Sequence, residues 1–146
     1  MTATPPANST PHKEESLRGV SNVDAARDWL NHRNIQDIEC IVPDLAGVAR
    51  GKMMPTEKFF SGPVMTMPAS IFAQTISGDY PEDDERFQHN PTDGDLYFRA
   101  DYSTLTTVPW ESDPTAQLIH DAYSREGAPV ETAPRNVLKR ILKLYE

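Results

Sequence analysis

The C-terminal segment, "TAPRNVLKRILKLYE", constrains the fold more than any other stretch of this chain. It predicts an amphipathic helix, because apolar side chains recur at helical spacing in one stripe: Val137, Leu138, Ile141, Leu142 and Tyr145. Pro134 suits the first helical turn, where its missing N–H costs nothing. No Gly or Asn follows as a cap, and an exposed stripe of this kind needs a partner surface. We therefore expect that the helix folds back, or that its partner lies beyond residue 146.

Composition narrows the classes of function. The 146 residues suffice for one domain with a real core, whereas 38% apolar residues and 13 prolines indicate that part of the chain is irregular. The net charge of −8 argues against a nucleic-acid-binding protein, which needs a basic face. The sequence contains no apolar stretch long enough to cross a membrane. The N-terminus lacks the basic start and the apolar segment of a secretory signal, so we expect no such signal. The single cysteine, Cys40, has no partner for an internal disulfide, which favours a cytoplasmic protein. Because Cys40 alternates with Ile38 and Val42, we expect a buried structural thiol and not a nucleophile.

The N-terminal half divides into three parts. Residues 1–20 are rich in Pro, Ser, Thr and charge, which predicts a disordered leader. Residues 21–34 predict a helix that begins at Ser21 and carries four apolar residues on or beside one face: Val23, Ala26, Trp29 and Leu30. Residues 36–55 predict a β-hairpin with its turn at "PDLAG", followed by one helical turn at "TEKFF".

The second half reads mainly as strands. "VMTMPASIFAQTI" is apolar enough for a buried strand, but Pro68 predicts an edge or a bulge within it. Residues 78–94 form a long acidic loop. Three further strands are predicted at "DLYFRAD", "STLTTVPW" and "TAQLIHDAYS", and a connector then leads into the final helix. This order predicts an α+β fold with a small mixed or antiparallel sheet.

Taken alone, these residues show few catalytic patterns. The four histidines are scattered without the spacing of a zinc site, and "GVARGK" lacks the spacing of a phosphate-binding loop. Between residues 79 and 101 the chain carries eight acidic residues against two arginines. A solvated loop is the default interpretation, and the alternative is a negative funnel that concentrates a cationic substrate.

Five stretches together carry a family resemblance: "DLAGVARGK", "MPASIFA", "DGDLYFRADYST", "TTVPW" and "EGAPVETAPRNVLKRIL". Their order and spacing resemble the N-terminal β-grasp domain of the glutamine synthetase family, most closely its γ-glutamylpolyamine synthetase (glutamate–putrescine ligase) branch. The resemblance covers about residue 35 to residue 146. It implies a β-grasp (ubiquitin-like) domain at 35–131, preceded by the helix at 21–34. Residues 132–146 would then begin a catalytic domain, as a connector helix leading into a barrel that this chain does not contain.

The resemblance also implies a reaction. ATP phosphorylates the γ-carboxylate of glutamate, assisted by Mg²⁺ or Mn²⁺, and an amine then attacks the γ-glutamyl phosphate. The barrel would bind ATP and the metal, so that this chain alone would be inactive and would hold no catalytic or metal-binding residue. The resemblance also implies a homo-oligomeric ring, which we take to be a dodecamer. It further implies a role for the enzyme in polyamine catabolism and nitrogen metabolism.

One departure from the family pattern concerns the amine. Where glutamine synthetases carry an aromatic-Asp-Gly-Ser-Ser run whose Asp helps to hold ammonium, this chain reads Thr66-Met67-Pro68-Ala69-Ser70. Met67 cannot replace the carboxylate, but its thioether could line a channel for the methylenes of a larger amine. We therefore expect Ser70 and Met67 to bind a polyamine or alkylamine in the neighbouring subunit. Strand packing for Met67 and a backbone-bonded hydroxyl for Ser70 are the alternatives.

Other polar and aromatic residues have structural interpretations. Trp110 is predicted as a core or interface anchor, and Asp101 and Thr104 as turn residues. Arg50 and Lys52 are expected to face solvent or a neighbouring subunit.

Two alternative functions stay open at this point. One is a glutamine synthetase that uses ammonia, and the other is a stand-alone β-grasp module that binds a partner and catalyses nothing.

Overall fold

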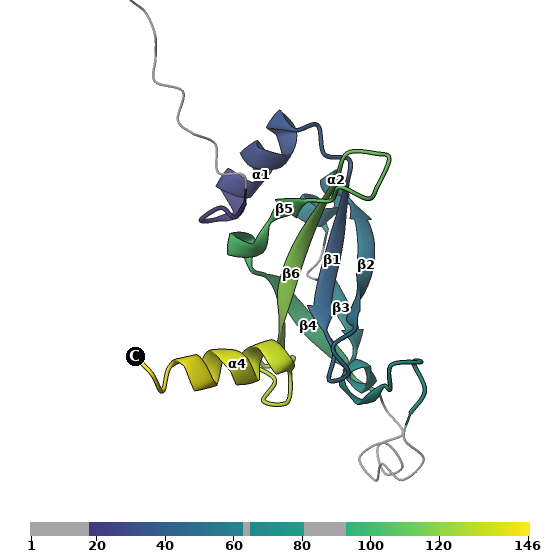
Figure 1. Cartoon of the computed structure of the whole chain (residues 1–146), viewed down its shortest axis with the longest axis vertical. Helices are drawn as coiled ribbons and strands as arrows, with labels where there is room; N and C mark the ends of the chain where they lie inside the picture. The colour runs from purple at the N-terminus through teal and green to yellow at the C-terminus, as the bar shows by residue number, and fades with distance from the viewer. Residues whose placement is uncertain (1–17, 63–64, 81–92) are drawn as a thin grey trace, which may run out of the picture.

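The computed structural model describes residues 18–62, 65–80 and 93–146, which form one mixed sheet with helices at its ends (Figure 1). The strand order is β2-β1-β6-β4-β3, and β5 pairs with β6 beside this path. Strands β1 and β6 are parallel, and the other pairs are antiparallel. The strand bounds are β1 Asp37–Pro43, β2 Ala49–Pro55, β3 Met65–Pro68, β4 Asp95–Ala100, β5 Thr106–Thr107 and β6 Thr115–Tyr123. The α+β layout is as predicted.

The predicted hairpin is β1 and β2. Alternate residues of β1, namely Ile38, Cys40 and Val42, are buried, as a half-buried strand requires. Gly47 turns the chain with φ +79°, a conformation that glycine adopts without strain. Gly51 lies against β1 so closely that a Cβ there would stand 2.0 Å from the Cys40 carbonyl oxygen, so this pairing requires glycine.

Helix α1 spans Val23–His32, inside the predicted 21–34. Its N-cap is Asn22 and not Ser21, because the Asn22 side chain accepts the Ala25 N–H at 2.9 Å. Ala26, Trp29 and Leu30 are buried as expected. Val23 is 42% exposed, so its predicted place on the buried face is wrong.

Two strand predictions need correction. The strand expected from "VMTMPASIFAQTI" is only the four-residue edge strand β3, and Pro68 leads into a 3₁₀ helix, η1, at Ala69–Ala73. The first two residues of "STLTTVPW" belong to a second 3₁₀ helix, η2, at Tyr102–Thr104, and only Thr106–Thr107 form a strand, β5. In both places a turn-forming residue starts the 3₁₀ helix: Pro68 precedes η1, and Asp101 caps the start of η2.

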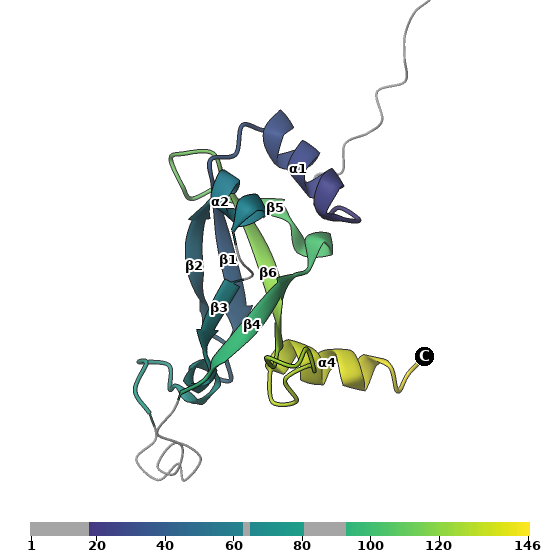
Figure 2. The ribbon, with the colours of Figure 1, turned by 180° about the vertical axis from the view of Figure 1, so that it is seen from behind.

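The core lies against one face of the sheet. It combines α1 with the buried alternate residues of β1 and β6 and with side chains from β3, η1 and β4. The short helix α2, Thr56–Ser61, closes the same end of the sheet as α1 (Figure 2). The hairpin turn, η1 and α4 lie at the opposite end of the sheet.

Helix α4, Pro134–Leu142, begins with Pro134 at its first turn, as predicted. It extends away from the sheet (Figure 1), and its apolar stripe is largely exposed: Leu138 56%, Ile141 46% and Leu142 53%. No described part of the chain covers this stripe.

Two predicted regions fall outside the described residues, namely 1–17 of the expected leader and 81–92 of the expected acidic loop. Within the described ranges, the structure contains no helix long and apolar enough to span a membrane.

Candidate functional site

Ser70 and Met67 lie at the end of the sheet where β3 becomes η1. The Ser70 side chain is buried, with the residue 3% exposed, and it belongs to the first turn of η1. Met67 is 6% exposed and packs into the hydrophobic core. Its surroundings match the packing alternative, whereas its role beside an amine remains a prediction.

Ser70 is the centre of a hydrogen-bonded chain of side chains. Its N–H donates to Asp93 Oδ1 at 3.0 Å, and its hydroxyl donates to Asp93 Oδ2. The Tyr80 hydroxyl donates to Ser70 Oγ at 2.9 Å, and Gln74 Nε2 donates to the Tyr80 hydroxyl at 3.3 Å. Among the described residues, the Ser70 hydroxyl bonds to the side chains of Asp93 and Tyr80 and not to the backbone, so the alternative of a backbone-bonded hydroxyl is wrong. Asp93 and Tyr80 are exposed.

A buried ion pair fastens this region to the hairpin turn. The Asp44 side chain is fully buried, and it accepts the Val48 N–H at 2.8 Å and Arg50 Nε at 2.8 Å. Arg50 Nη2 donates to the Thr75 carbonyl at 2.9 Å, which also accepts the Gly78 N–H. The solvent-facing part of the Arg50 prediction is therefore wrong, because its guanidinium bridges the hairpin turn and the 75–79 turn, whereas a place beside a neighbouring subunit remains a prediction.

The structure agrees with the predicted exposure of Lys52 and contradicts a place in the core for Trp110. Lys52 is exposed, as expected, and its Nζ donates to the Thr66 carbonyl at 2.7 Å, which joins the two outer strands of the sheet, β2 and β3. Trp110 is 65% exposed, so it is not a core residue. Its Nε1 donates to Glu39 Oε1 at 3.3 Å, and Gln117 Nε2 donates to the other oxygen of Glu39 at 2.8 Å. An interface role for Trp110 remains a prediction.

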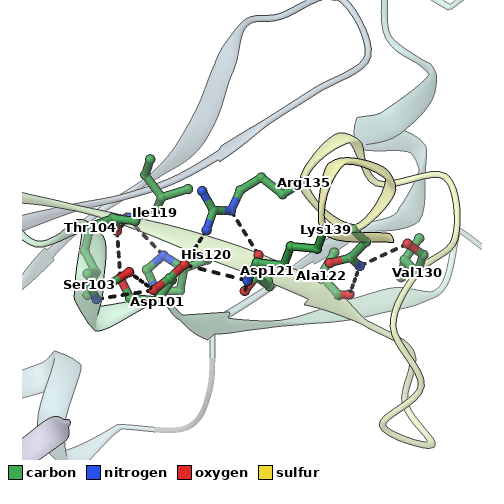
Figure 3. Close-up of polar contacts among 12 residues, drawn as sticks. Asp101, Ser103, Thr104, Ile119, His120, Asp121, Ala122, Val130, Arg135 and Lys139 are labelled. Carbon is green, nitrogen blue, oxygen red and sulfur yellow. Dashed lines mark hydrogen bonds and ion pairs between the residues drawn. The ribbon is translucent and has the colours of Figure 1, made fainter. Parts of the chain in front are cut away.

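A second polar cluster holds α4 to the sheet (Figure 3). Arg135 Nε lies 2.9 Å from Asp121 Oδ1 and its Nη2 bonds to Asp101, while Lys139 Nζ bonds to Asp121 and lies 3.6 Å from Asp101. Burial alone would raise the pKa of Asp101, but the Ser103 hydroxyl and the two cations together lower it. The cluster links β6 and the end of β4 to the first two turns of α4.

The turn roles predicted for Asp101 and Thr104 are confirmed. Asp101 accepts the Ser103 N–H at 3.2 Å, and Thr104 Oγ1 donates to the Asp101 carbonyl while accepting the Ile119 N–H. The ion pairs of Asp101 were not predicted. The sequence signal for them was the opposite charge of two segments: the acidic segment 79–101, and the C-terminal segment 125–146, which carries five Lys and Arg residues against three Glu.

Two buried titratable groups lie in the core, away from Ser70. Burial raises the pKa of the Cys40 thiol to about 12, which confirms the buried, inert thiol that the sequence predicts. Burial lowers the pKa of His120 to about 4, although its contacts with the Leu118 and Ile41 backbone oppose the shift. Its ring packs edge-on against Phe59, with centroids 6.3 Å apart. Neither group has the exposure that a catalytic nucleophile or base needs.

Three curated relatives match most of the chain. It is 29% identical over 136 residues to a glutamate–isopropylamine ligase from a Pseudomonas species, covering 91% of this chain and 29% of that protein. It is 33% identical over 102 residues to type-1 glutamine synthetase 2 of Dictyostelium discoideum, covering 68% and 19%. It is 28% identical over 133 residues to gamma-glutamylputrescine synthetase PuuA of Escherichia coli (strain K12), covering 88% and 28%. These relatives support the glutamine synthetase family for this chain. No protein-family model matches it.

Solved structures show the same fold. A "novel glutamine synthase homolog" superposes with a TM-score of 0.61 at 20% identity, covering 76% of this chain and 26% of that one. A structure described as "Apo GmaS without ligand" gives 0.57 at 24% identity, covering 79% and 24%. The expected β-grasp fold is thereby confirmed. The chain spans less than a third of the length of the curated relatives named above.

Proposed function

We propose that this chain is the β-grasp part of an ATP-dependent ligase that joins the γ-carboxylate of glutamate to an alkylamine or polyamine. The observation that carries the proposal is the similarity to a glutamate–isopropylamine ligase over 91% of the chain. The similarity to a gamma-glutamylputrescine synthetase over 88% of the chain supports an amine larger than ammonia. Glutamate and the amine are the proposed substrates, and γ-glutamyl phosphate is the proposed intermediate.

The catalytic groups of this reaction are assigned to a part of the protein outside this chain. Among the described residues, no group of three or more His, Cys, Asp or Glu side chains could hold a metal ion. The residues that the structure describes therefore do not fit a site for Mg²⁺ or Mn²⁺ with ATP, and we derive no step of the reaction from them. The domain boundaries at 35–131 and 132–146, and a ring of identical subunits, belong to the same proposal.

The contribution of this chain would be one wall of the amine site. Ser70 is the better placed of the two candidates, because its hydroxyl connects to Asp93 and Tyr80, whose side chains reach the surface. Met67, whose side chain lies in the hydrophobic core, would contribute an apolar surface to this wall.

The proposal is tested on the full-length protein that carries this chain. ADP release is followed with ATP, Mg²⁺ and glutamate while isopropylamine, putrescine or ammonium chloride is supplied. We expect ADP release that depends on one of the two organic amines, with a kcat/KM at least tenfold above that for ammonia. Equal or better turnover with ammonia would reject the amine assignment and leave a glutamine synthetase.

That alternative has its own support. The relative from Dictyostelium discoideum is named a glutamine synthetase and is the most identical of the three reported above.

A stand-alone β-grasp module that binds a partner is the third possibility. It predicts no ADP release with any of the three amines.

A further inference from the structure

We propose that the Asp93 carboxylate is the anion that receives the charged amine beside Ser70. Asp93 would supply the negative charge that Met67, on strand β3, cannot provide. This inference rests on the proposed function, because it names the group that recognises the amine of that reaction.

Strand pairing is what brings Asp93 to Ser70. Strands β3 and β4 are antiparallel, with Pro68 opposite Asp95, and the Ala69 N–H donates to the Gly94 carbonyl at 3.0 Å just beyond the ladder. One residue further along each of these two segments, residue 93 therefore lies opposite residue 70. Both oxygens of Asp93 accept hydrogen bonds from Ser70, one from its N–H and one from its hydroxyl. The carboxylate is thus held in a fixed position and does not move freely on a loop.

The hydrogen bonds that link these four described side chains run toward Asp93. Gln74 donates to Tyr80, Tyr80 donates to Ser70, and Ser70 donates to Asp93. An alkylammonium group carries only donors, so it needs acceptors at the end of such a chain. A carboxylate offers about four lone-pair sites, of which Ser70 uses two, and Asp93 is exposed. Its remaining acceptor capacity can therefore bind an ammonium group from the surface.

Asp93 also has a structural role that must be separated from recognition. Helix η1 has no side-chain cap from its own N-cap residue, Pro68, and the bond from the Ser70 N–H to Asp93 serves in place of one. Asparagine keeps a carbonyl oxygen for the Ser70 N–H and removes the negative charge. Asp93→Asn therefore tests the charge, Asp93→Ala tests charge and cap together, and Asp93→Glu retains the charge on a longer side chain.

The matched control is Asp79→Asn. Asp79 precedes Tyr80 and contributes a negative charge in the same region, but its carboxylate accepts from Ser77 and not from Ser70. If the amine is attracted only by the general acidity of this region, the two Asn variants should behave alike. If Asp93 binds the amine directly, only Asp93→Asn should weaken amine binding.

The experiment uses the full-length protein with isopropylamine and putrescine as probes. KM and kcat are measured by ADP release, amine affinity by calorimetry without turnover, and folding by the melting temperature. We expect Asp93→Asn to raise the amine KM and Kd at least tenfold, to change kcat less than twofold, and to leave the melting temperature unchanged. Asp93→Glu should lie between Asp93→Asn and wild type, and Asp79→Asn should stay within twofold of wild type.

The remaining outcomes overturn the inference in distinguishable ways. An active wild type with unchanged KM and Kd in Asp93→Asn would reject Asp93 and leave the proposed function intact. Equal losses of amine affinity in Asp93→Asn and Asp79→Asn would show that the general negative charge of this region attracts the amine, and that Asp93 does not bind it directly. A wild type that neither binds nor uses either amine would reject the proposed function together with the role of Asp93.

Discussion

Asp44 is the residue whose environment most limits what can be changed in this fold. Its side chain is fully buried, and Arg50 is the cation that compensates its charge. Removing one partner of a buried ion pair leaves an uncompensated charge and costs about 3–5 kcal/mol. We therefore expect Arg50→Ala to lower the free energy of unfolding by about that amount in urea denaturation.

Lys52→Ala is the control for this prediction. Lys52 is an exposed cation two residues along the same strand, and we expect a change of less than about 1 kcal/mol. An Arg50→Ala variant as stable as Lys52→Ala would show that the pair does not stabilise the fold.

His120 predicts how stability depends on pH. Its pKa is about 4 in the folded chain and about 6.5 when unfolded, so the unfolded chain binds the extra proton between these values. Stability should therefore fall as the pH decreases from about 6.5 toward 4, by about 3 kcal/mol from this residue. Urea denaturation at pH 7 and pH 4.5 measures the difference. His120→Gln should flatten this dependence, and a pH profile unchanged by His120→Gln would contradict the assignment.

Residues that sequence reasoning placed correctly are those whose role depends on their neighbours in the chain. Burial of Cys40 follows from alternation along β1, and the turn role of Asp101 follows from the residues after it. The bonds from Arg50 to Thr75 and from Ser70 to Asp93 join residues 25 and 23 positions apart. No local pattern predicts such pairs, because they arise only when the strands have paired.

At the scale of elements, α4 combines a fixed start with an exposed apolar stripe. Arg135 and Lys139 bind Asp121, and the buried Asn136 donates to the Ala122 carbonyl at 2.7 Å. These contacts fix the first two turns, but the stripe that follows lacks a partner among the described residues. Exposed apolar surface of this kind favours association.

We therefore expect the 146-residue chain to associate as its concentration rises. In sedimentation or sizing experiments, Leu138→Glu combined with Ile141→Glu should shift it toward a monomer by removing the apolar surface. Lys143→Glu, which changes charge on the same segment and leaves the stripe intact, should not. A wild-type chain that is monomeric at every concentration would count against association through α4.

The same scale shows where prediction of elements succeeds and where it fails. Helices α1 and α4, the hairpin and β6 have strong periodicity, and the structure contains them close to their predicted bounds. Helix η1 and strand β5 were predicted within longer strands, because apolar content alone does not separate a 3₁₀ turn from a buried strand.

For the whole molecule, the sequence could not predict that β1 and β6 pair in parallel at the centre of the sheet. The two strands lie far apart in the chain, and nothing in either one specifies its partner. The β-grasp expectation came from the resemblance to a family, and the solved structures confirm it.

A competition between amines tests the central claim most directly. The full-length protein is given ATP, Mg²⁺ and glutamate with equal concentrations of isopropylamine, putrescine and ammonium chloride, and the products are identified by mass spectrometry. We predict that a γ-glutamyl amide of isopropylamine or putrescine is the main product. Glutamine as the main product would contradict it and identify ammonia as the natural acceptor.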